Sequence, residues 1–124
     1  MIRVLQVVTI LNRGGLETML MNYYRNIDRE KVQFDFLVHR EQRGAYEEEI
    51  ESLGGRIYRM PPISPSSLIN YNRKLDYFFH KHPEYSIVHS HLDTLSTFVL
   101  RKAKKVGVPA KIAHCHAQGA SSDW

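Results

Sequence analysis

The sequence of 124 residues is 43% hydrophobic and 24% charged, which is the composition of an ordinary globular domain. Seventeen Lys and Arg against thirteen Asp and Glu leave a net charge of +4, which favours anionic partners such as phosphates, membrane headgroups or nucleic acids. The densest basic run, residues 101–105, has no interleaved aromatic side chains and suits a solvated helix end, so nucleic-acid binding is not expected.

The cysteine count and the apolar runs indicate a compartment. Cys115 is the only cysteine, so the domain has no internal disulfide, which is typical of a reducing environment. No apolar run approaches the roughly 20 residues that a membrane helix needs. Residues 1–11 are interrupted by Arg3 and Gln6, which indicates a strand and not a signal peptide. We therefore expect a cytoplasmic protein, or one at the inner face of a membrane.

Two alternating patterns predict the elements in chain order. An apolar, Val- and Ile-rich run at 2–10 is typical of a strand that is buried on both faces. Apolar side chains then recur every three or four residues, which predicts a helix over 16–27. The same alternation predicts strands at 32–39, 56–60, 86–91 and 110–116, and helices at 46–53, 68–79 and 95–106.

Glycine and proline mark the ends of these helices. Gly54 and Gly55 follow the second predicted helix, and Gly107 follows the fourth. Glycine accepts the left-handed conformation that often ends a helix, so these positions suit a C-terminal cap. Pro83 follows the third helix and Pro109 the fourth, and proline cannot continue a helix.

Five strands alternating with four helices predict an α/β fold, a doubly wound, Rossmann-like parallel sheet in three layers over residues 1–124. Ligands bind such sheets outside the carboxyl ends of the strands, near the point where the strand order reverses. The fourth and fifth strands should be neighbours. No helix is predicted after the fifth strand, so either a partner covers it or the sequence is the front part of a longer chain. We expect a fragment.

Histidines end three of the predicted strands, at His39, His91 and His116. A histidine at the ligand edge can donate to phosphate or sugar oxygens, or transfer a proton near neutral pH. We expect functional roles for His91 and His116. Their partners two residues earlier, His89 and His114, are expected to be packed inside and bonded to backbone or neighbours.

The two His-x-His pairs also raise the question of a metal. Zinc needs at least a third protein ligand, and Asp93 and Asp123 have no fixed spacing to the pairs, so no metal site is expected. Cys115 points to the opposite face of its strand from His114 and His116, because side chains alternate along a strand. Its thiol is expected to be packed, not nucleophilic.

The segment NRGGLET, residues 12–18, carries a second signal. Gly14 and Gly15 before a helix let the backbone approach a ligand, and the helix N-terminus and Arg13 add positive charge. This favours an anion such as a diphosphate, although two glycines can equally form a tight turn. The dinucleotide fingerprint and the lysine-bearing phosphate loop are both absent. Glu17 in the first helical turn is expected to be structural.

With these residues in view, the sequence resembles the N-terminal domain of a family 4 glycosyltransferase of the GT-B fold, of the bacterial capsular or exopolysaccharide type. Three short motifs in order support the resemblance over essentially the whole chain. They are Gly-Gly-x-Glu at residues 14–17, Val-His-x-His at 88–91, and Gly-Val-Pro at 107–109 followed by a strand that ends in His116.

The resemblance implies two Rossmann-like domains facing each other, of which this chain is the acceptor-side one. It implies that Gly14 and Gly15 lie near the donor diphosphate, and that His116 approaches the transferred sugar as the catalytic histidine. Members usually retain the anomeric configuration and need no metal or other cofactor. The implied partners are a nucleotide-sugar donor and a glycan or lipid-linked acceptor. The second domain, which carries most nucleotide-sugar contacts, is missing, so this chain alone is expected to be inactive.

Two alternatives stay open. One is a sugar-nucleotide epimerase on the same two-domain plan. The other is a non-catalytic subunit that recruits an anionic membrane or a separate catalytic chain, for which the basic balance and the uncovered fifth strand are the motivation.

Overall fold

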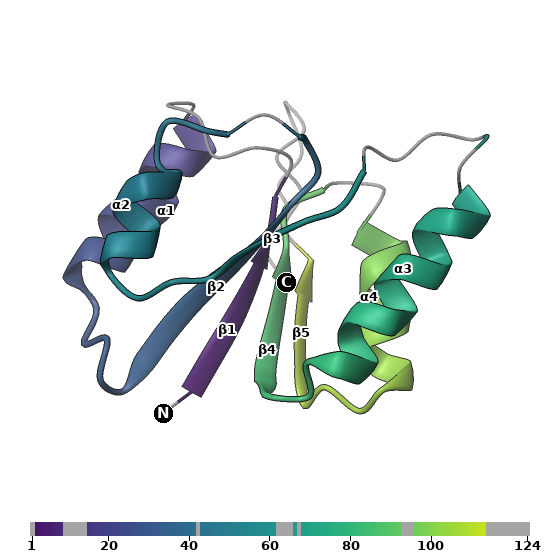
Figure 1. Cartoon of the computed structure of the whole chain (residues 1–124). Coiled ribbons are helices and arrows are strands. Elements are labelled where there is room, and N and C mark those ends of the chain that lie inside the picture. The colour runs from purple at the N-terminus through teal and green to yellow at the C-terminus, as the bar shows by residue number, and fades with distance from the viewer. Residues whose placement is uncertain are drawn as a thin grey trace, which may run out of the picture.

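A computed structural model of the chain describes residues 2–8, 15–41, 43–61, 66, 68–92 and 96–113. Two helices cover each face of a central sheet, so the domain has three layers (Figure 1). In chain order the elements are β1 (Ile2–Val7), α1 (Gly15–Asn26), β2 (Val32–Val38), α2 (Glu47–Ser52), β3 (Ile57–Arg59), α3 (Leu68–Lys81), β4 (Tyr85–Ser90), α4 (Ser96–Lys105) and β5 (Ala110–Ala113). None of the described helices is long and apolar enough to cross a membrane.

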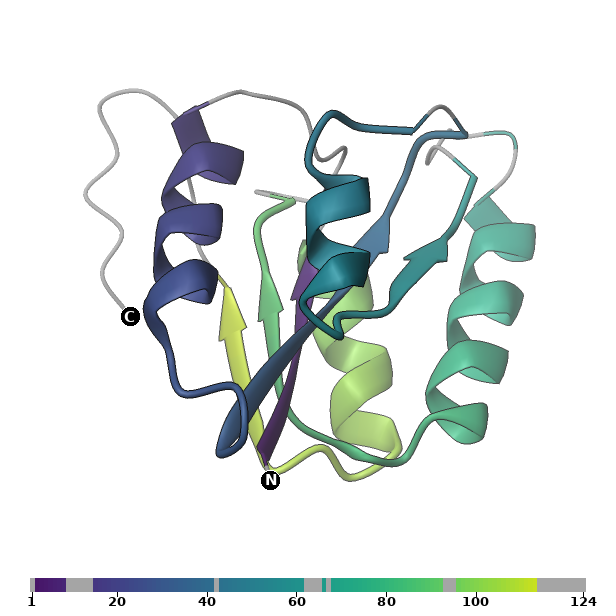
Figure 2. The ribbon, with the colours of Figure 1, turned by 60° about the vertical axis from the view of Figure 1, so that its left-hand side comes forward.

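The five strands form one sheet in the order β3-β2-β1-β4-β5, and every neighbouring pair is parallel. All five arrows accordingly point the same way in Figure 2. The chain moves outward from β1 to β3 and then crosses back to β4 and β5, so the strand order reverses between β1 and β4. The predicted doubly wound parallel sheet, with its fourth and fifth strands side by side, is confirmed.

The predicted helices and strands are all present, with boundaries that differ by a few residues. β4 begins at Tyr85, one residue before the predicted start. The predicted ends of the first and fifth strands, at 9–10 and 114–116, lie outside the described residues. Of the glycines that were predicted to end α2 and α4, Gly54 and Gly107 are left-handed, with φ of 93° and 88°, whereas Gly55 is not.

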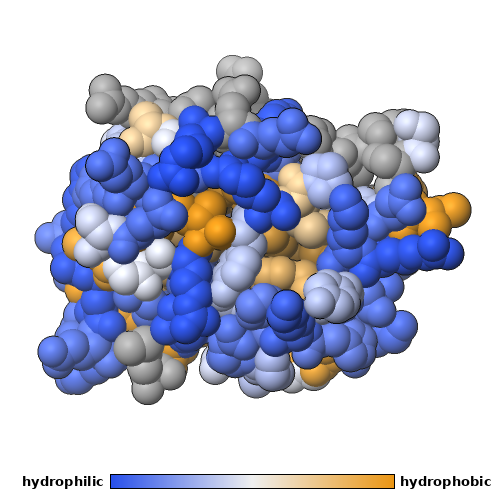
Figure 3. Space-filling view, viewed as in Figure 1, coloured by the Kyte–Doolittle hydropathy of each residue, from blue (hydrophilic) through white to orange (hydrophobic). Residues whose placement is uncertain are grey.

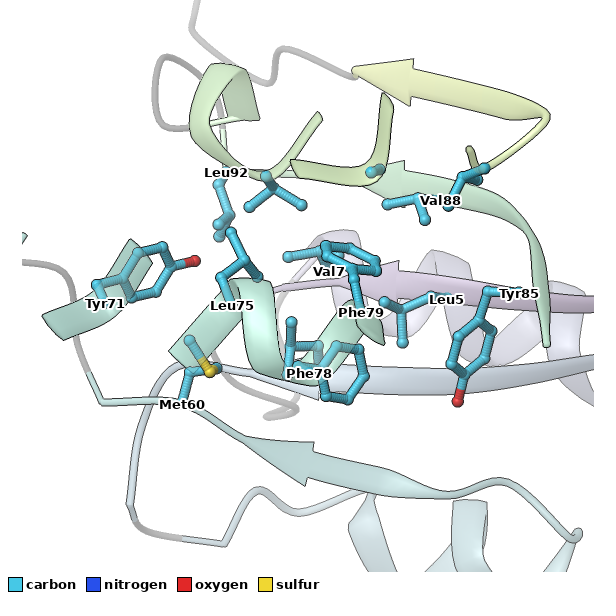
Figure 4. Packing of buried hydrophobic residues seen from close by; sticks show 14 residues of the cluster. Leu5, Val7, Met60, Tyr71, Leu75, Phe78, Phe79, Tyr85, Val88 and Leu92 are labelled. Carbon is cyan, nitrogen blue, oxygen red and sulfur yellow. The ribbon is translucent and has the colours of Figure 1, made fainter. Parts of the chain in front are cut away.

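The larger apolar cluster lies between the sheet and the α3/α4 layer. Figure 4 shows side chains from α3 pointing at side chains from β1 and β4. The fully buried members include Leu5, Val7, Tyr71, Leu75 and Val88. Burial of this apolar surface, at roughly 25 cal/mol per Å², is the main force that holds α3 on the sheet.

A smaller cluster lies under α1 and α2 and contains Tyr24, Phe36 and Ile50. The Tyr24 hydroxyl donates to Oε1 of Gln33 at 2.5 Å, and burial raises the pKa of Tyr24 to about 12. Gly55 is buried beside this cluster. A Cβ on Gly55 would lie 2.6 Å from Cγ2 of Ile50 and 2.7 Å from the hydroxyl of Tyr24, so this close approach requires glycine at position 55.

A buried carboxylate joins three strands. Asp35 is 0% exposed and accepts two hydrogen bonds from the Arg3 guanidinium at 3.0 Å. The Tyr85 hydroxyl donates to Asp35 at 2.6 Å, and the backbone amide of Arg56 donates at 2.9 Å. Burial is the main cause of the raised pKa of Tyr85, and the hydrogen bond to Asp35 adds to it. These bonds satisfy the buried charge, and they link β1, β2 and β4.

Candidate functional site

The carboxyl ends of β1 and β4 form the edge where a doubly wound sheet binds its ligands, because the strand order reverses there. Backbone hydrogen bonds between neighbouring strands continue just past the strand ends. The amide of His91 donates to the carbonyl of Val7 at 2.9 Å, and the amide of Val8 donates to the carbonyl of Leu37 at 3.0 Å. His91 after β4 and His39 after β2 therefore lie at the same edge, as the sequence predicted.

The His91 side chain is bonded to a residue of β1 and is only 5% exposed. Its Nε2 lies 2.9 Å from Oε1 of the buried Gln6 on β1. Because a carboxamide oxygen only accepts, Nε2 carries the proton and donates it to Gln6. His91 thus lies just after the end of β4, and its predicted role in binding stays a prediction. The ring is anchored to β1, so only a small part of it faces solvent.

His89 lies directly beside His91, with the two ring centroids 4.0 Å apart. The strand register places His89 between Gln6 of β1 and Ile112 of β5. This agrees with the prediction that His89 is packed among its neighbours. Gln6, His89 and His91 thus form one row of polar side chains across the switch point, and side-chain alternation puts Gln6 on the same sheet face as Val8, which packs under α1.

His39 has a structural role at this edge. Its Nδ1 lies 2.8 Å from the carbonyl oxygen of Val8, and its Nε2 lies 2.7 Å from the hydroxyl of Tyr71 on α3. A neutral imidazole satisfies both partners, since Nδ1–H donates to the carbonyl and Nε2 accepts from the hydroxyl. Burial lowers the pKa of His39, which favours this neutral form. The side chain therefore ties the end of β1 to α3.

Gly15 is the first residue of α1, and no described heavy atom lies within 4 Å of a Cβ placed on it. Gly15 is exposed among the described residues, and the helix dipole concentrates about half a positive charge at this N-terminus. Glu17 lies in the first turn, as expected. Arg13 and Gly14 lie outside the described residues, so their predicted part in binding a diphosphate stays a prediction.

The predicted catalytic residue His116 also lies outside the described residues, together with His114, Cys115, Asp93 and Asp123. Its role stays a prediction. In the part of the chain that the structure describes, no three His, Cys, Asp or Glu side chains gather closely enough to hold a metal ion.

Among the features that were not predicted from the sequence, two bear on binding. One is the bond between His91 and Gln6, which joins residues 85 positions apart. The other is a groove of about 720 Å³ between β3 and α3, lined by aromatic and basic side chains that include Tyr58, Arg73 and Lys81. The helical spacing of Arg73 and Lys81 was a usable signal for one wall of the groove, whereas its second wall comes from a strand.

Comparison with known proteins shows the family to which the domain belongs. A family model described as "Glycosyl transferase 4-like domain" matches residues 14–124. The chain is 44% identical to "Putative glycosyltransferase EpsF" of Bacillus subtilis (strain 168) over 114 residues, which is 92% of this chain and 30% of that protein. The chain thus spans 30% of the length of that curated relative.

Two solved structures share the fold at low sequence identity. The crystal structure of MurG from Acinetobacter baumannii gives a TM-score of 0.63 at 13% identity, over 93% of this chain and 34% of that one. The C-terminal domain of a hydrogenase from Pyrococcus furiosus gives 0.62 at 16% identity, over 90% of this chain and 89% of that one. These likenesses show the fold alone. The family model covers most of the sequence, and the chain belongs to the glycosyl transferase 4-like domain family.

Proposed function

We propose that the chain is the N-terminal, acceptor-side domain of a GT-B glycosyltransferase. The complete enzyme would transfer a sugar from a nucleotide-sugar donor to a glycan or lipid-linked acceptor in polysaccharide biosynthesis. The observation that carries the proposal is the family match over residues 14–124, on a doubly wound sheet whose switch point bears His91. The 44% identity to a relative named as a glycosyltransferase supports it.

The donor diphosphate would lie over the N-terminus of α1. The exposure of Gly15 among the described residues and its place as the first residue of α1 support this position. Arg13 and Gly14 immediately precede it in sequence and would add a positive charge and a backbone amide. His91, anchored by Gln6, would contact the sugar or the acceptor from β4.

His116 would act at the transferred sugar, and the anomeric configuration would be retained without a metal or other cofactor. A second Rossmann-like domain would supply most of the nucleotide contacts. The enzyme would work on the cytoplasmic side, where it can reach a lipid-linked acceptor. These assignments follow the family resemblance, and the experiment below tests the central one.

In the full-length transferase, His116→Ala should lower turnover by about 10²- to 10⁴-fold, because a positioned acid–base group contributes that much to a proton transfer. Turnover is measured as glycoside formed from a labelled nucleotide-sugar donor. The matched control is His80→Ala, since His80 is exposed in the last turn of α3, which leads into the start of β4 and so lies opposite the ligand edge.

Both variants should unfold at the temperature of the parent protein. Near-normal turnover of His116→Ala would reject its catalytic role. A free epimer of the donor as the product, in place of a glycoside, would replace the transferase proposal with the epimerase one.

A further inference from the structure

A buried carboxamide on the central strand needs a physical reason. Hydrophilic side chains cover much of the face shown in Figure 3, where water can satisfy their polar groups. Gln6 of β1 is only 2% exposed, and the strand register places it between Phe36 of β2 and His89 of β4. Burying a carboxamide costs free energy unless its polar atoms are bonded. An apolar side chain would avoid this cost, so the presence of Gln6 calls for a reason other than packing.

The reason lies in how β1 holds His91. The backbone amide of His91 donates to the carbonyl of Val7 at 2.9 Å, and its ring Nε2 donates to Oε1 of Gln6 at 2.9 Å. The first bond fixes the backbone just after β4, and the second fixes the rotation of the ring. The ring of His89 packs beside it, with the centroids 4.0 Å apart. Gln6 therefore helps to set the orientation of the His91 imidazole.

The same bond also determines where His91 carries its proton. A neutral imidazole has one N–H group and one lone pair, on different nitrogens. Because the carboxamide oxygen of Gln6 accepts from Nε2, the lone pair is on Nδ1. A lone pair accepts a hydrogen bond from a hydroxyl group, whereas it repels the oxygen of an ionised phosphate, which can only accept. This tautomer therefore favours a hydroxyl group over an anion as the ligand of His91.

We propose that Gln6 is a positioning residue, which holds His91 in the tautomer that accepts a hydrogen bond from a sugar hydroxyl at Nδ1. The inference rests on the proposed function and makes it more specific, because it assigns His91 to a hydroxyl of the transferred sugar or of the acceptor and not to the diphosphate. Gln6 is buried, so it acts on the substrate through His91.

The tautomer is measured by ring-nitrogen NMR on the chain with isotope-labelled histidine. The signals of His91 are assigned as those that disappear in His91→Gln. At about pH 7.5, the parent should show a protonated Nε2 and an unprotonated Nδ1. Gln6→Leu should lower the fraction of this tautomer, because it leaves a buried N–H group without its acceptor. A parent with the proton on Nδ1 would overturn the proposal.

Turnover of the full-length transferase separates positioning from stability. The matched control is Gln33→Leu, since Gln33 is 5% exposed on β2 and accepts from the Tyr24 hydroxyl, far from His91 in the strand register. Gln6→Leu should lower kcat/KM by about 10- to 100-fold, the size of effect that a misplaced active-site group produces. Gln33→Leu should leave kcat/KM of the folded protein within about twofold. Equal losses would show that Gln6 is only structural.

Gln6→Glu keeps an acceptor oxygen and adds a negative charge beside Nε2. An opposite charge favours the imidazolium, so the pKa of His91 should rise relative to the parent by about 1–3 units. A neutral ring is needed to accept the hydroxyl, so turnover falls as the pH drops through this pKa. The acidic limb of the pH–rate profile should therefore move to higher pH, and above it Gln6→Glu should regain the turnover that Gln6→Leu lacks. His89 also titrates, but every variant contains it.

Two pH results would contradict the proposal. An acidic limb that does not move in Gln6→Glu would show that Gln6 does not control His91 during turnover. A shift of the alkaline limb instead would show that the imidazolium is the working form, as expected for a ligand that only accepts hydrogen bonds. Far-UV circular dichroism and thermal unfolding give the folded fraction of each variant.

The two kinds of measurement separate this inference from the proposed function. A full-length parent that forms no glycoside would reject the transferase and, with it, this role of Gln6 in turnover. The ring-nitrogen signals need no sugar donor, so they decide the tautomer of His91 by themselves.

Discussion

The two helix layers cover opposite faces of the same sheet, and they differ in both core and surface. Among the described residues, the α3/α4 side holds a cluster of fourteen buried apolar residues, whereas the α1/α2 side holds seven. The α1/α2 side instead carries Gly15 at the start of α1 and the Gln6 side chain that anchors His91. One side thus contributes more of the apolar burial, and the other provides more of the candidate site.

This comparison leads to opposite expectations for substitutions on the two sides. Changes inside the α3/α4 cluster should reduce stability, because apolar burial is proportional to the area removed from water. Changes at the exposed residue Gly15, where α1 begins, should leave stability nearly intact and affect mainly ligand binding. The predictions below test this division, in order of decreasing effect on the free energy of unfolding.

Leu75→Ala should lower the free energy of unfolding by about 2–5 kcal/mol, because it removes a fully buried side chain and leaves a cavity. Ile69→Ala on the same helix should change it by less than about 0.5 kcal/mol, since Ile69 is largely exposed. Denaturant unfolding of both variants measures the difference. Equal losses would show that α3 does not pack on the sheet through Leu75.

Gly55→Ala should lower the free energy of unfolding by about 1–3 kcal/mol, because its Cβ would lie 3.0 Å or less from Ile50, Tyr24 and the Phe34 backbone. Gly15→Ala should leave it within about 1 kcal/mol, since alanine is the better helix former and meets no described atom. In the full-length transferase, Gly15→Ala should still lower turnover at limiting donor. Unchanged turnover would contradict the diphosphate position over α1.

His39 gives the smallest effect, and it depends on pH. Burial lowers its pKa in the folded state, whereas an unfolded histidine titrates near about 6.5. The unfolded state therefore binds the proton more readily. The stability that neutral His39 contributes is complete above about pH 6.5, and it is lost as the pH falls from there toward the lowered pKa.

The measurement is the free energy of unfolding of the parent and of His39→Asn, at about pH 7.5 and about pH 5.5. The parent should lose more stability on acidification than the variant, by up to about 1.4 kcal/mol, because pH 5.5 lies about one unit below the pKa of an unfolded histidine. All other residues are common to the two proteins, so their contributions cancel in the comparison. Parallel losses would show that His39 is not buried in its neutral form.

Much of the fold was predicted from local patterns. The alternation of apolar runs and helical periodicity predicted every strand and helix, and Gly54 and Gly107 were expected in the left-handed region that they occupy. Part of the site was also predicted, because a histidine at the end of a parallel strand must lie at the carboxyl edge. His39 and His91 were placed there from the sequence, but the burial of His39 against Tyr71 was not predicted.

The features that were missed depend on partners distant in sequence. Nothing near Asp35 in the sequence indicates that it will bind Arg3 and Tyr85, which come from two other strands. The groove beside α3 needs both the helix and the edge strand β3. No local pattern contains such pairs, since residues 32 to 85 positions apart come together only when the strands pair into the sheet.

By itself, the sequence determined the class of fold, the order of the elements and the presence of histidines and glycines at strand ends, because local periodicity and backbone preference control these features. Only the tertiary structure decided that His91 is anchored by Gln6, that His39 joins β1 to α3, and that positive charge gathers on one helix layer. The physical reason is that hydrogen-bond partners and surface fields depend on distances in space, which are set when the helices pack on the sheet.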